Sequence, residues 1–462
     1  MVAMVAMAAI VAMAAMAANA AGDHRFNRYH RIIATIATIA TIALCCPIGA
    51  SAQQPVRCAR GDAYCREVSR IVADARVRRA VAHIEQTDAA AMRELIALTQ
   101  IPAPPFRESE RARRYAELLR AAGADSVDID EAGNVLALRR GTRRTRTVAV
   151  AGHLDTVFPE GTDVRVHQRG DTLFAPGVAD NTRGLITILQ ILRAVVHAGI
   201  RADANLLFVG TVGEEGLGDL RGTKHLFREG EQSIDAYIAV DGGSDEAVTT
   251  GAIGSKRYRV NFAGPGGHSW GLFGNPSPIH AISRAINKFD DAAMRFTATF
   301  PTTTYNIGRI GGGTSVNSIA TNAWAEVDLR SEDATHLNGI DSLFHVSMVN
   351  ALNEQNELRT SGPELTLEAR LVGNRPSGHT PSTQPIVQRA IAVTRALRLT
   401  PRLDASSTDA NVPMSRGIPA IALGRGGVAG NTHSPDEWWL NENGTRGIRR
   451  VLYTMLAEGG LR

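Results

Sequence analysis

Residues 147–156 read TVAVAGHLDT, an apolar run that ends in a histidine and an aspartate two positions apart. Three further apolar runs, at 204–209, 236–240 and 419–423, likewise end at glycine or at a cluster of polar residues. Segments with helical spacing, such as 185–197, separate them. Near-continuous apolar runs that alternate with helices indicate a mostly parallel sheet covered by helices on both faces. Ligands bind such sheets at the carboxyl ends of the strands, so the residues that follow each run are the candidates for a site.

The pattern changes between residues 254 and 373. Segments 256–262 and 323–330 alternate like half-buried strands, whereas 278–293 and 333–353 have the apolar spacing of helices. Two helices with several alternating strands predict a small α+β domain inserted into the larger one. We therefore predict an α/β fold in which a larger domain, formed by residues 53–253 and 374–462, carries an inserted domain at 254–373.

The overall composition narrows the class of protein. The chain of 462 residues is 44% hydrophobic and 21% charged, enough for two or three domains with their own cores. This balance excludes a mostly disordered, collagen-like or coiled-coil chain. The formal net charge of +4 is small and no nucleic-acid-binding motif accompanies it, so we expect no nucleic-acid partner. Four cysteines exclude a disulfide-dense scaffold.

Residues 1–52 have the features of a targeting segment. After a Met/Ala repeat at 1–21, three arginines precede an apolar stretch at 32–44 and the small residues Ala50-Ser51-Ala52, as in a secretory signal peptide. The apolar stretch is about thirteen residues long, short of the roughly twenty that span a membrane. We expect cleavage after Ala52 and export to a bacterial periplasm, whereas an uncleaved segment would anchor the chain in the membrane. Cleavage leaves Cys58 and Cys65, either as a disulfide or as two surface thiols.

Candidate metal ligands follow the apolar runs. They are His153 and Asp155 after the first run, Asp180 before the helical segment 185–197, Glu214 and Glu215 after the second run, Asp241 after the third run, and His433 near the end of the chain. Each is a weak signal alone: a His-x-Asp pair is usually a surface pair, a Glu-Glu pair is usually solvated, and a strand-ending Asp often caps a helix.

Taken together, these residues are a stronger signal. Parallel strands would bring two histidines and three carboxylates to one edge of the sheet, where uncompensated carboxylates repel one another. A pair of divalent cations removes that repulsion. Mixed imidazole and carboxylate ligation suits Zn²⁺, with Co²⁺ or Mn²⁺ as substitutes. Asp155, which shares a face with His153 on an extended segment, would orient the ring of that histidine.

These ordered motifs resemble those of a known family. The motifs are His153-Leu154-Asp155-Thr156-Val157, Asp180-Asn181, Gly213-Glu214-Glu215, Asp241 and His433, within a resemblance that covers about residues 95–457. The pattern is similar to that of the M20 group of co-catalytic zinc peptidases and deacylases, including its peptidase T-like and carboxypeptidase G-like branches. The resemblance implies a zinc-exopeptidase fold whose larger domain is catalytic and whose inserted domain is a lid that also forms a homodimer.

The resemblance also implies roles for these residues. Asp180 would bridge two metals, His153 and Asp241 would complete one site, and Glu215 and His433 would complete the other. Glu214 would be the general base that takes a proton from a metal-bridged water and returns it to the leaving amine. In this family the peptide bond after the bridging aspartate is commonly cis, which predicts a cis bond between Asp180 and Asn181.

The inserted domain supplies further candidates by resemblance. His268, within Gly266-Gly267-His268-Ser269, is similar to the lid histidine that stabilises the tetrahedral oxyanion, often from the partner subunit. Asn317 and Arg330 lie in segments that resemble the substrate clamp, and a guanidinium suits a substrate carboxylate. The alternatives are a turn residue for His268 and a strand-end ion pair for Arg330.

Two other classes of function remain open. Gly267-His268-Ser269-Trp270-Gly271 matches the Gly-x-Ser-x-Gly elbow, so a serine hydrolase with Ser269, Asp409 and His433 is conceivable. That elbow needs a strand followed at once by a helix, and Asn275-Pro276-Ser277-Pro278 intervenes here. A non-catalytic binding protein would have lost the base or a ligand, whereas all six positions are intact. We therefore expect an enzyme.

One residue bears on the class of substrate. Arg330 fits a substrate with a free carboxylate beside the scissile amide. We predict an exported dinuclear zinc exopeptidase of short peptides, with an N-acyl amino acid amidohydrolase that uses the same site as the alternative.

Overall fold

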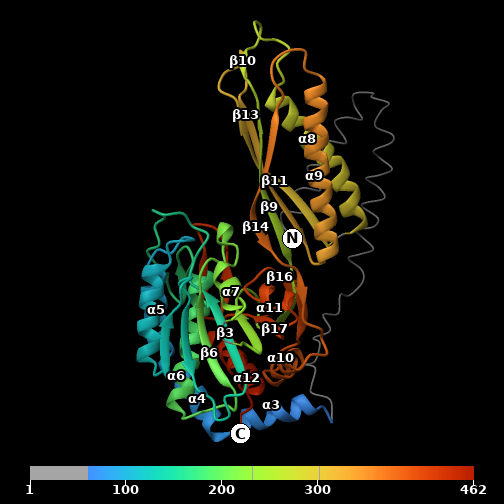
Figure 1. The fold of residues 1–462 in the computed structure, drawn as a ribbon. Helices are drawn as coiled ribbons and strands as arrows, with labels where there is room; N and C mark the ends of the chain where they lie inside the picture. The colour runs from blue at the N-terminus through green and yellow to red at the C-terminus, as the bar shows by residue number, and fades with distance from the viewer. Residues whose placement is uncertain (1–60, 231–232, 301, 462) are drawn as a thin grey trace, which may run out of the picture. The chain divides into compact units, whose positions relative to one another are not determined.

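The computed structural model describes residues 61–230, 233–300 and 302–461. Its largest sheet has the strand order β1-β2-β6-β3-β7-β17-β8-β15, with β16 paired to β8 (Figure 1). The strands are β1 (Ser126–Ile129), β2 (Val135–Arg139), β3 (Thr147–His153), β6 (Asn205–Thr211), β7 (Ala236–Val240), β8 (Ala247–Ala252), β15 (Gly378–His379), β16 (Arg402–Ser406) and β17 (Ala420–Leu423). The central strands β6, β3, β7 and β17 are parallel neighbours. The predicted α/β fold with a mostly parallel sheet is confirmed.

Both faces of this sheet are buried, as the continuous apolar runs predict. Val148 and Val150 of β3 belong to one hydrophobic core, and Ala149 and Ala151 belong to another on the opposite face. The first core is covered by α3 (Ala63–Ala73), α4 (Ala75–Thr99), α5 (Ser109–Ala121), α6 (Gly184–His197), α10 (Pro385–Ala396) and α12 (Gly444–Gly459). The second core includes residues of the short helices α7 (Arg221–Leu226) and α11 (Asn411–Ser415).

One helical segment is divided. The sequence predicts a single helix over residues 68–101, whereas the structure has α3 and α4 with Asp74 between them. The backbone of Asp74 is extended, and its carboxylate accepts a hydrogen bond from Arg76 N at 2.7 Å. Aspartate is a strong N-cap residue, so it starts a new helix at a position where the apolar spacing alone continues.

The segment predicted as an inserted domain has a sheet and a core of its own. Four antiparallel strands are ordered β11 (Thr303–Gly312), β13 (Asn322–Ser331), β9 (Gly254–Ala263) and β14 (Thr366–Arg375). Helices α8 (Pro278–Thr299) and α9 (Ala334–Glu357) pack on one face of this lid sheet, around residues such as Phe262, Phe289 and Phe344 (Figure 1). The opposite face carries polar side chains such as those of Arg259 and Glu326, together with Trp324. The proposed domain limits at 253/254 and 373/374 stay predictions.

Smaller elements complete the fold. Strands β18 (Val428–Gly430), β19 (Trp438–Leu440), β5 (Thr172–Phe174) and β4 (His167–Arg169) form a second four-stranded sheet, and β10 (Gly267–His268) pairs with β12 (Ser318–Ile319). Helix η2 (Val178–Arg183) and helix η3 (Gly216–Gly218) lie in the connections after β5 and β6. Within the described residues, no helix has both the length and the apolar content needed to cross a membrane. The predicted signal peptide and Cys58 lie outside those residues.

Candidate metal centre

The predicted metal ligands converge at the carboxyl edge of the parallel strands. His153 is the last residue of β3, Glu214 and Glu215 follow β6, and Asp241 follows β7. His153 Nε2 lies 3.2 Å from Asp180 Oδ1, and His433 Nε2 lies 3.3 Å from Asp180 Oδ2 and 3.0 Å from Glu215 Oε1. The topology thus brings together side chains that are far apart in the sequence.

The ligand atoms form two groups that share one aspartate. His153, Asp180 and Asp241 place one atom each within 4.8 Å of one another, and so do Asp180, Glu215 and His433. A third group that meets the same limit, His153, Glu214 and Glu215, includes the candidate base. Each group combines one imidazole with two carboxylates, a donor set that suits divalent transition metals such as Zn²⁺. The residues therefore fit the binding of divalent metal ions, and Asp180 is common to the first two of these groups.

The electrostatics of the cluster agree with a cation site. Burial and, after it, repulsion from the neighbouring Asp180 raise the pKa of Asp241 from 3.8 to about 6. Hydrogen bonds to Asp180 and Glu215 raise the pKa of His433 to about 10. Carboxylates this close repel one another unless positive charge stands beside them. Positive charge from bound cations would offset that repulsion.

Arg425 brings further positive charge to the centre, and sequence analysis did not assign it a role there. Its Nη1 lies 3.2 Å from Asp180 Oδ1 and 3.5 Å from Asp241 Oδ1, and the residue is buried. The arginine follows β17, the fourth parallel strand, within Gly424-Arg425-Gly426-Gly427. The signal that could have located it is the same as for the ligands, namely a polar residue at the carboxyl end of a parallel strand.

Glu437 holds the loop that carries Asp180. It is the second residue of the centre that was not identified from the sequence. This fully buried carboxylate accepts hydrogen bonds from Gly177 N at 3.1 Å, Ala179 N at 2.8 Å and Asp180 N at 2.9 Å. Burial raises the pKa of Glu437, whereas the three backbone donors lower it. The peptide bond between Asp180 and Asn181 is cis, as the family resemblance predicts.

Asp155 is placed beside the ligands, but its contacts differ from the expected ones. Its backbone carbonyl, not its carboxylate, lies at 3.0 Å from Nδ1 of His153; Oδ1 is 3.7 Å from that nitrogen. The carboxylate instead accepts hydrogen bonds from Glu214 N at 3.0 Å and Glu215 N at 2.7 Å. Asp155 therefore fixes the backbone of the Glu-Glu pair as well as the histidine ring.

Glu214 is buried beside the cluster and pairs with an arginine of the lid sheet. Nη1 of Arg375, the last residue of β14, lies 2.9 Å from Glu214 Oε1, and Nη2 donates to the carbonyl oxygen of Glu214. Burial raises the pKa of Glu214 well above its usual range, and repulsion from Glu215 acts in the same direction, whereas Arg375 opposes it. Sequence analysis did not single out Arg375, because its partner lies 161 positions away.

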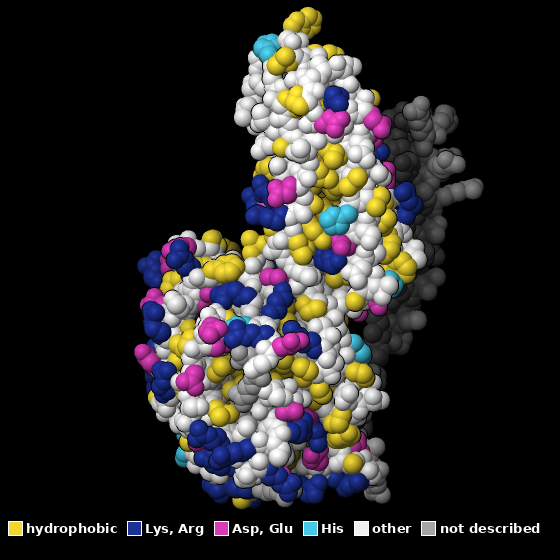
Figure 2. Space-filling view, viewed as in Figure 1, with side chains coloured by type: hydrophobic (Ala, Val, Ile, Leu, Met, Phe, Trp, Pro, Cys, Tyr) yellow, Lys and Arg dark blue, Asp and Glu magenta, His cyan; other side chains and the backbone are white. Residues whose placement is uncertain are grey.

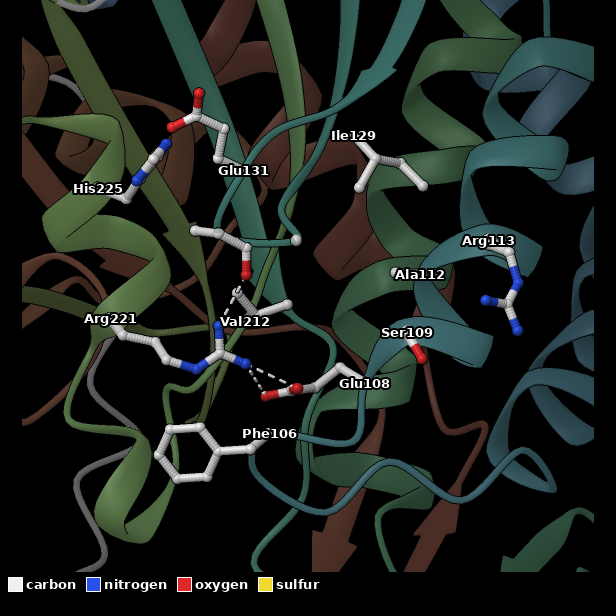
Figure 3. A pocket seen from close by; sticks show the side chains of 12 residues that line it. Phe106, Glu108, Ser109, Ala112, Arg113, Ile129, Glu131, Val212, Arg221 and His225 are labelled. Carbon is white, nitrogen blue, oxygen red and sulfur yellow. Dashed lines mark hydrogen bonds and ion pairs between the residues drawn. The ribbon is translucent and has the colours of Figure 1, made fainter.

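Arg221 packs against the loop that precedes Glu214. Gly213 has a φ of +67°, and a Cβ there would meet Arg221 Cγ at 2.7 Å. The guanidinium of Arg221 contacts both carboxylate oxygens of Glu108 at 2.7 Å (Figure 3). It also donates to the carbonyl oxygen of Ala132 at 2.8 Å. Glu108, Ala132 and Arg221 line a cavity of about 770 Å³. The close approach of Arg221 to the loop explains why glycine occupies position 213.

Among the described residues, the side-chain hydrogen bonds of the lid candidates lie within the lid and do not include the cluster. Nδ1 of His268 accepts hydrogen bonds from Trp270 N and Gly271 N at 3.2 Å, both within its own turn. Asn317 Oδ1 accepts from Ser315 Oγ at 2.7 Å. Arg330 Nε donates to Asp328 Oδ2 at 2.6 Å, which is the strand-end ion pair that the sequence left as an alternative.

The serine-hydrolase arrangement is not assembled among the described residues. Asp409 is buried and accepts hydrogen bonds from the hydroxyls of Thr211 and Thr223. His433 lies on Asp180 and Glu215. Neither set of contacts includes Ser269, whose backbone N–H donates to Asn317 O in the lid.

Comparison with known proteins agrees with this geometry. The chain is 25% identical over 355 residues to the Bacillus subtilis (strain 168) protein YqjE, covering 72% of this chain and 90% of that one. It is 24% identical over 253 residues to succinyl-diaminopimelate desuccinylase from Corynebacterium glutamicum, covering 54% of this chain and 68% of the relative. Among solved structures, the aminopeptidase PepT from Bacillus cereus ATCC 10987 shares the fold, with a TM-score of 0.64 at 21% identity over 79% of this chain and 97% of that one.

The match to a family profile decides the assignment. The profile described as "Peptidase family M20/M25/M40" matches residues 149–457, which include every predicted metal ligand. Two of the similar proteins are named as a desuccinylase and an aminopeptidase, and with the family match they indicate that this chain is a hydrolase of C–N amide bonds. The protein belongs to the peptidase family M20/M25/M40.

Proposed function

We propose that this protein is a dinuclear zinc exopeptidase that hydrolyses the amide bond of short peptides. The observation that carries the proposal is the pair of ligand groups that share Asp180, one with His153 and Asp241 and the other with Glu215 and His433. Two cations held there would polarise the scissile carbonyl and lower the pKa of the attacking water. Co²⁺ or Mn²⁺ would fit the same donors.

The residues of the chain then transfer the proton, position the base and bind the substrate. Glu214, buried and with a raised pKa, takes a proton from the attacking water and delivers it to the leaving amine. Asp155 holds the backbone of Glu214, and Arg375 holds its side chain. Arg330 and Asn317 are proposed to bind the substrate carboxylate and backbone.

The oxyanion donor is proposed to come from a second copy of the chain. His268 is the exposed last residue of β10, and among the described residues its side chain accepts hydrogen bonds only from Trp270 N and Gly271 N in the following turn. A homodimer formed through the lid would allow His268 of one subunit to complete the centre of the other. Separating the dimer should then abolish turnover while leaving metal binding in place.

A deacylase is the second candidate, because one similar protein is named succinyl-diaminopimelate desuccinylase. An N-acyl amino acid amidohydrolase would use the same ligands and the same base. A panel of dipeptides and N-acetyl amino acids, tested with purified protein with and without a chelator, separates the two. Preferred hydrolysis of the dipeptides supports the exopeptidase.

Export is also part of the proposal and rests on the amino-terminal sequence alone. The basic residues, apolar stretch and Ala50-Ser51-Ala52 favour cleavage and a periplasmic location. The mass of the mature amino terminus in cells tests this: a chain that begins at Gln53 supports cleavage, and an intact segment supports a membrane anchor.

A further inference from the structure

One cross-strand row of the lid sheet is unusually basic. Arg370 of β14, Arg259 of β9, Glu326 of β13 and Arg309 of β11 stand directly opposite one another across all four strands. We name these four residues the arginine row. It lies on the sheet face opposite α8 and α9, because the alternate residues Tyr258 and Val327 belong to the core beneath those helices. Figure 2 shows basic and acidic side chains together where Figure 1 places β9.

A β-bulge places the last arginine in the row. The register between β11 and β13 shifts between Ile307 and Arg309, so that Arg309 rather than Gly308 pairs with Glu326. Without the shift, alternation would turn Arg309 toward the helices. Bulges often redirect a side chain beside a functional site. Here the bulge adds a third arginine to one row.

The charges in the row do not balance. Glu326 accepts from Arg259 Nη1 at 2.7 Å and from Arg309 Nη1 at 3.0 Å. Arg370 has no side-chain hydrogen bond or ion pair with the described residues, and it stands directly opposite Arg259. Like charges directly opposite in a sheet are destabilising. A bound anion would remove that repulsion.

The row lines a cavity that reaches the metal-ligand loop. The cavity has a volume of about 470 Å³ and is lined by Arg257, by all four residues of the arginine row, and by Leu217. Leu217 is two positions beyond Glu215, and Arg257 Nη1 donates to the carbonyl oxygen of Gly216 at 2.7 Å. A molecule in this cavity therefore lies between the lid sheet and the loop that carries the candidate base.

We propose that the arginine row binds a carboxylate of the peptide substrate that is remote from the scissile amide. This inference rests on the proposed function and names its substrate class as short acidic peptides. Arg257, which touches the metal-ligand loop, and Arg259 are two residues apart on β9, roughly 7 Å at the rise of a strand. An extended peptide covers that distance in about two residues. A carboxylate bound by the row would thus lie about two extended residues beyond the point where Arg257 contacts the loop.

The chemistry of the row favours a single carboxylate over a nucleic acid. Arg259 stacks on Trp324 with its guanidinium carbon 3.5 Å from the ring centroid, and Arg309 lies 5.4 Å from the same ring. The indole face is therefore covered and does not offer a stacking surface to a base. Glu326 within the row would repel a polyanion, whereas the guanidinium edge of Arg370 is free to bind a carboxylate through two parallel hydrogen bonds.

The test compares matched peptides with purified full-length protein. The substrates are Ala-Ala-Glu and Ala-Ala-Gln, each with a free and an amidated carboxyl terminus, and the proteins are the wild type, Arg370→Gln, Arg370→Glu and Arg78→Glu. Arg78 is an exposed arginine of α4 and serves as the charge-reversal control. We expect the wild type and Arg78→Glu to prefer the peptides that carry the extra carboxylate by about tenfold in kcat/KM. Arg370→Gln should lose that preference, and Arg370→Glu should reverse it.

The outcomes separate this inference from the function on which it rests. The proposal is supported if Arg370→Gln loses the preference for the glutamate side chain or the preference for the free carboxyl terminus. Which of the two preferences is lost identifies the carboxylate that the row binds. Equal preference in the wild type and Arg370→Glu overturns it while the exopeptidase assignment stands. Failure of the wild type to hydrolyse any of the four peptides counts against both. The preference should also shrink at 1 M salt, because an exposed ion pair is screened there.

Discussion

Arg375, the last residue of lid strand β14, forms a buried ion pair with Glu214, the proposed general base, at 2.9 Å between Nη1 and Oε1. The side chains of both residues are only 5% exposed. The preceding residue, Asn374, also contacts the segment that follows the base. Its N–H donates to Asp219 Oδ1 at 2.7 Å, and its carbonyl oxygen accepts from Lys224 Nζ at 2.9 Å. The end of the lid sheet therefore holds the loop that carries the base.

Replacing Arg375 with glutamine should reduce hydrolysis more than it reduces metal binding. The change removes the charged partner of Glu214 and leaves a buried carboxylate without compensation. A misplaced base costs roughly a hundredfold in rate, so we expect kcat to fall by about that factor. Steady-state kinetics on a cleaved dipeptide and the metal content of the same sample measure the two effects.

Arg375→Lys is the matched variant for that experiment. Lysine keeps the charge but does not reach Glu214 Oε1 and the backbone carbonyl with a planar fork, so it should recover only part of the rate. A thermal melt checks that both variants are folded. Wild-type kcat in Arg375→Gln would show that the pair has no part in placing the base.

Glu437→Gln should weaken metal binding. The carboxylate accepts three backbone hydrogen bonds from the loop of Asp180, and an amide places a donor where one of those acceptors stood. Loss of groups that orient metal ligands typically costs 10- to 100-fold in affinity, so we expect a loss in that range by competition with a chromogenic chelator. Glu442→Gln, an exposed change five positions along, should leave the affinity at the wild-type value.

Asp125 should give the free energy of unfolding a measurable pH dependence. A hydrogen bond from Arg201 is the main cause that lowers the pKa of Asp125 from 3.8 to about 2. Because the folded-state pKa lies below the unfolded one, the stabilisation is present above about pH 4 and is lost as the pH falls through about 2. The pair is partly exposed, so we expect Asp125→Asn to lower the free energy of unfolding by about 1 kcal/mol at pH 7.

Urea denaturation of the wild type and Asp125→Asn at pH 7, 4 and 3 measures that dependence. The difference between them should narrow below pH 4. Asp128→Asn, an exposed change in the adjoining strand β1, serves as the control. A constant difference for Asp125→Asn across this range would mean that the carboxylate's charge is not the cause.

The larger sheet could be predicted because its signal is local and repeated. The run at 148–151 is apolar at every position, and in the structure its alternate residues enter two separate cores. The ends of strands then locate His153 and Asp241 without any knowledge of the strand order. Asp74 shows the limit of the same approach, because one capping residue divides a helix whose apolar spacing continues.

The supporting residues of the centre could not be predicted in the same way. Glu437 and Arg375 act through contacts that cross 257 and 161 positions of the chain. Their residue types are common on surfaces, and only the tertiary fold shows that they are buried. The position of Arg425 could have been predicted, because this residue follows a parallel strand. A positively charged side chain is, however, not expected among metal ligands, which are carboxylates and imidazoles.

The most direct test of the central claim is the metal content and turnover of Glu214→Gln beside the wild type. The account predicts two divalent ions per chain in both proteins, with hydrolysis of the dipeptide panel that a chelator abolishes in the wild type and that falls at least a hundredfold in the variant. Full turnover by Glu214→Gln, or a wild type that hydrolyses the panel without bound metal, would contradict it.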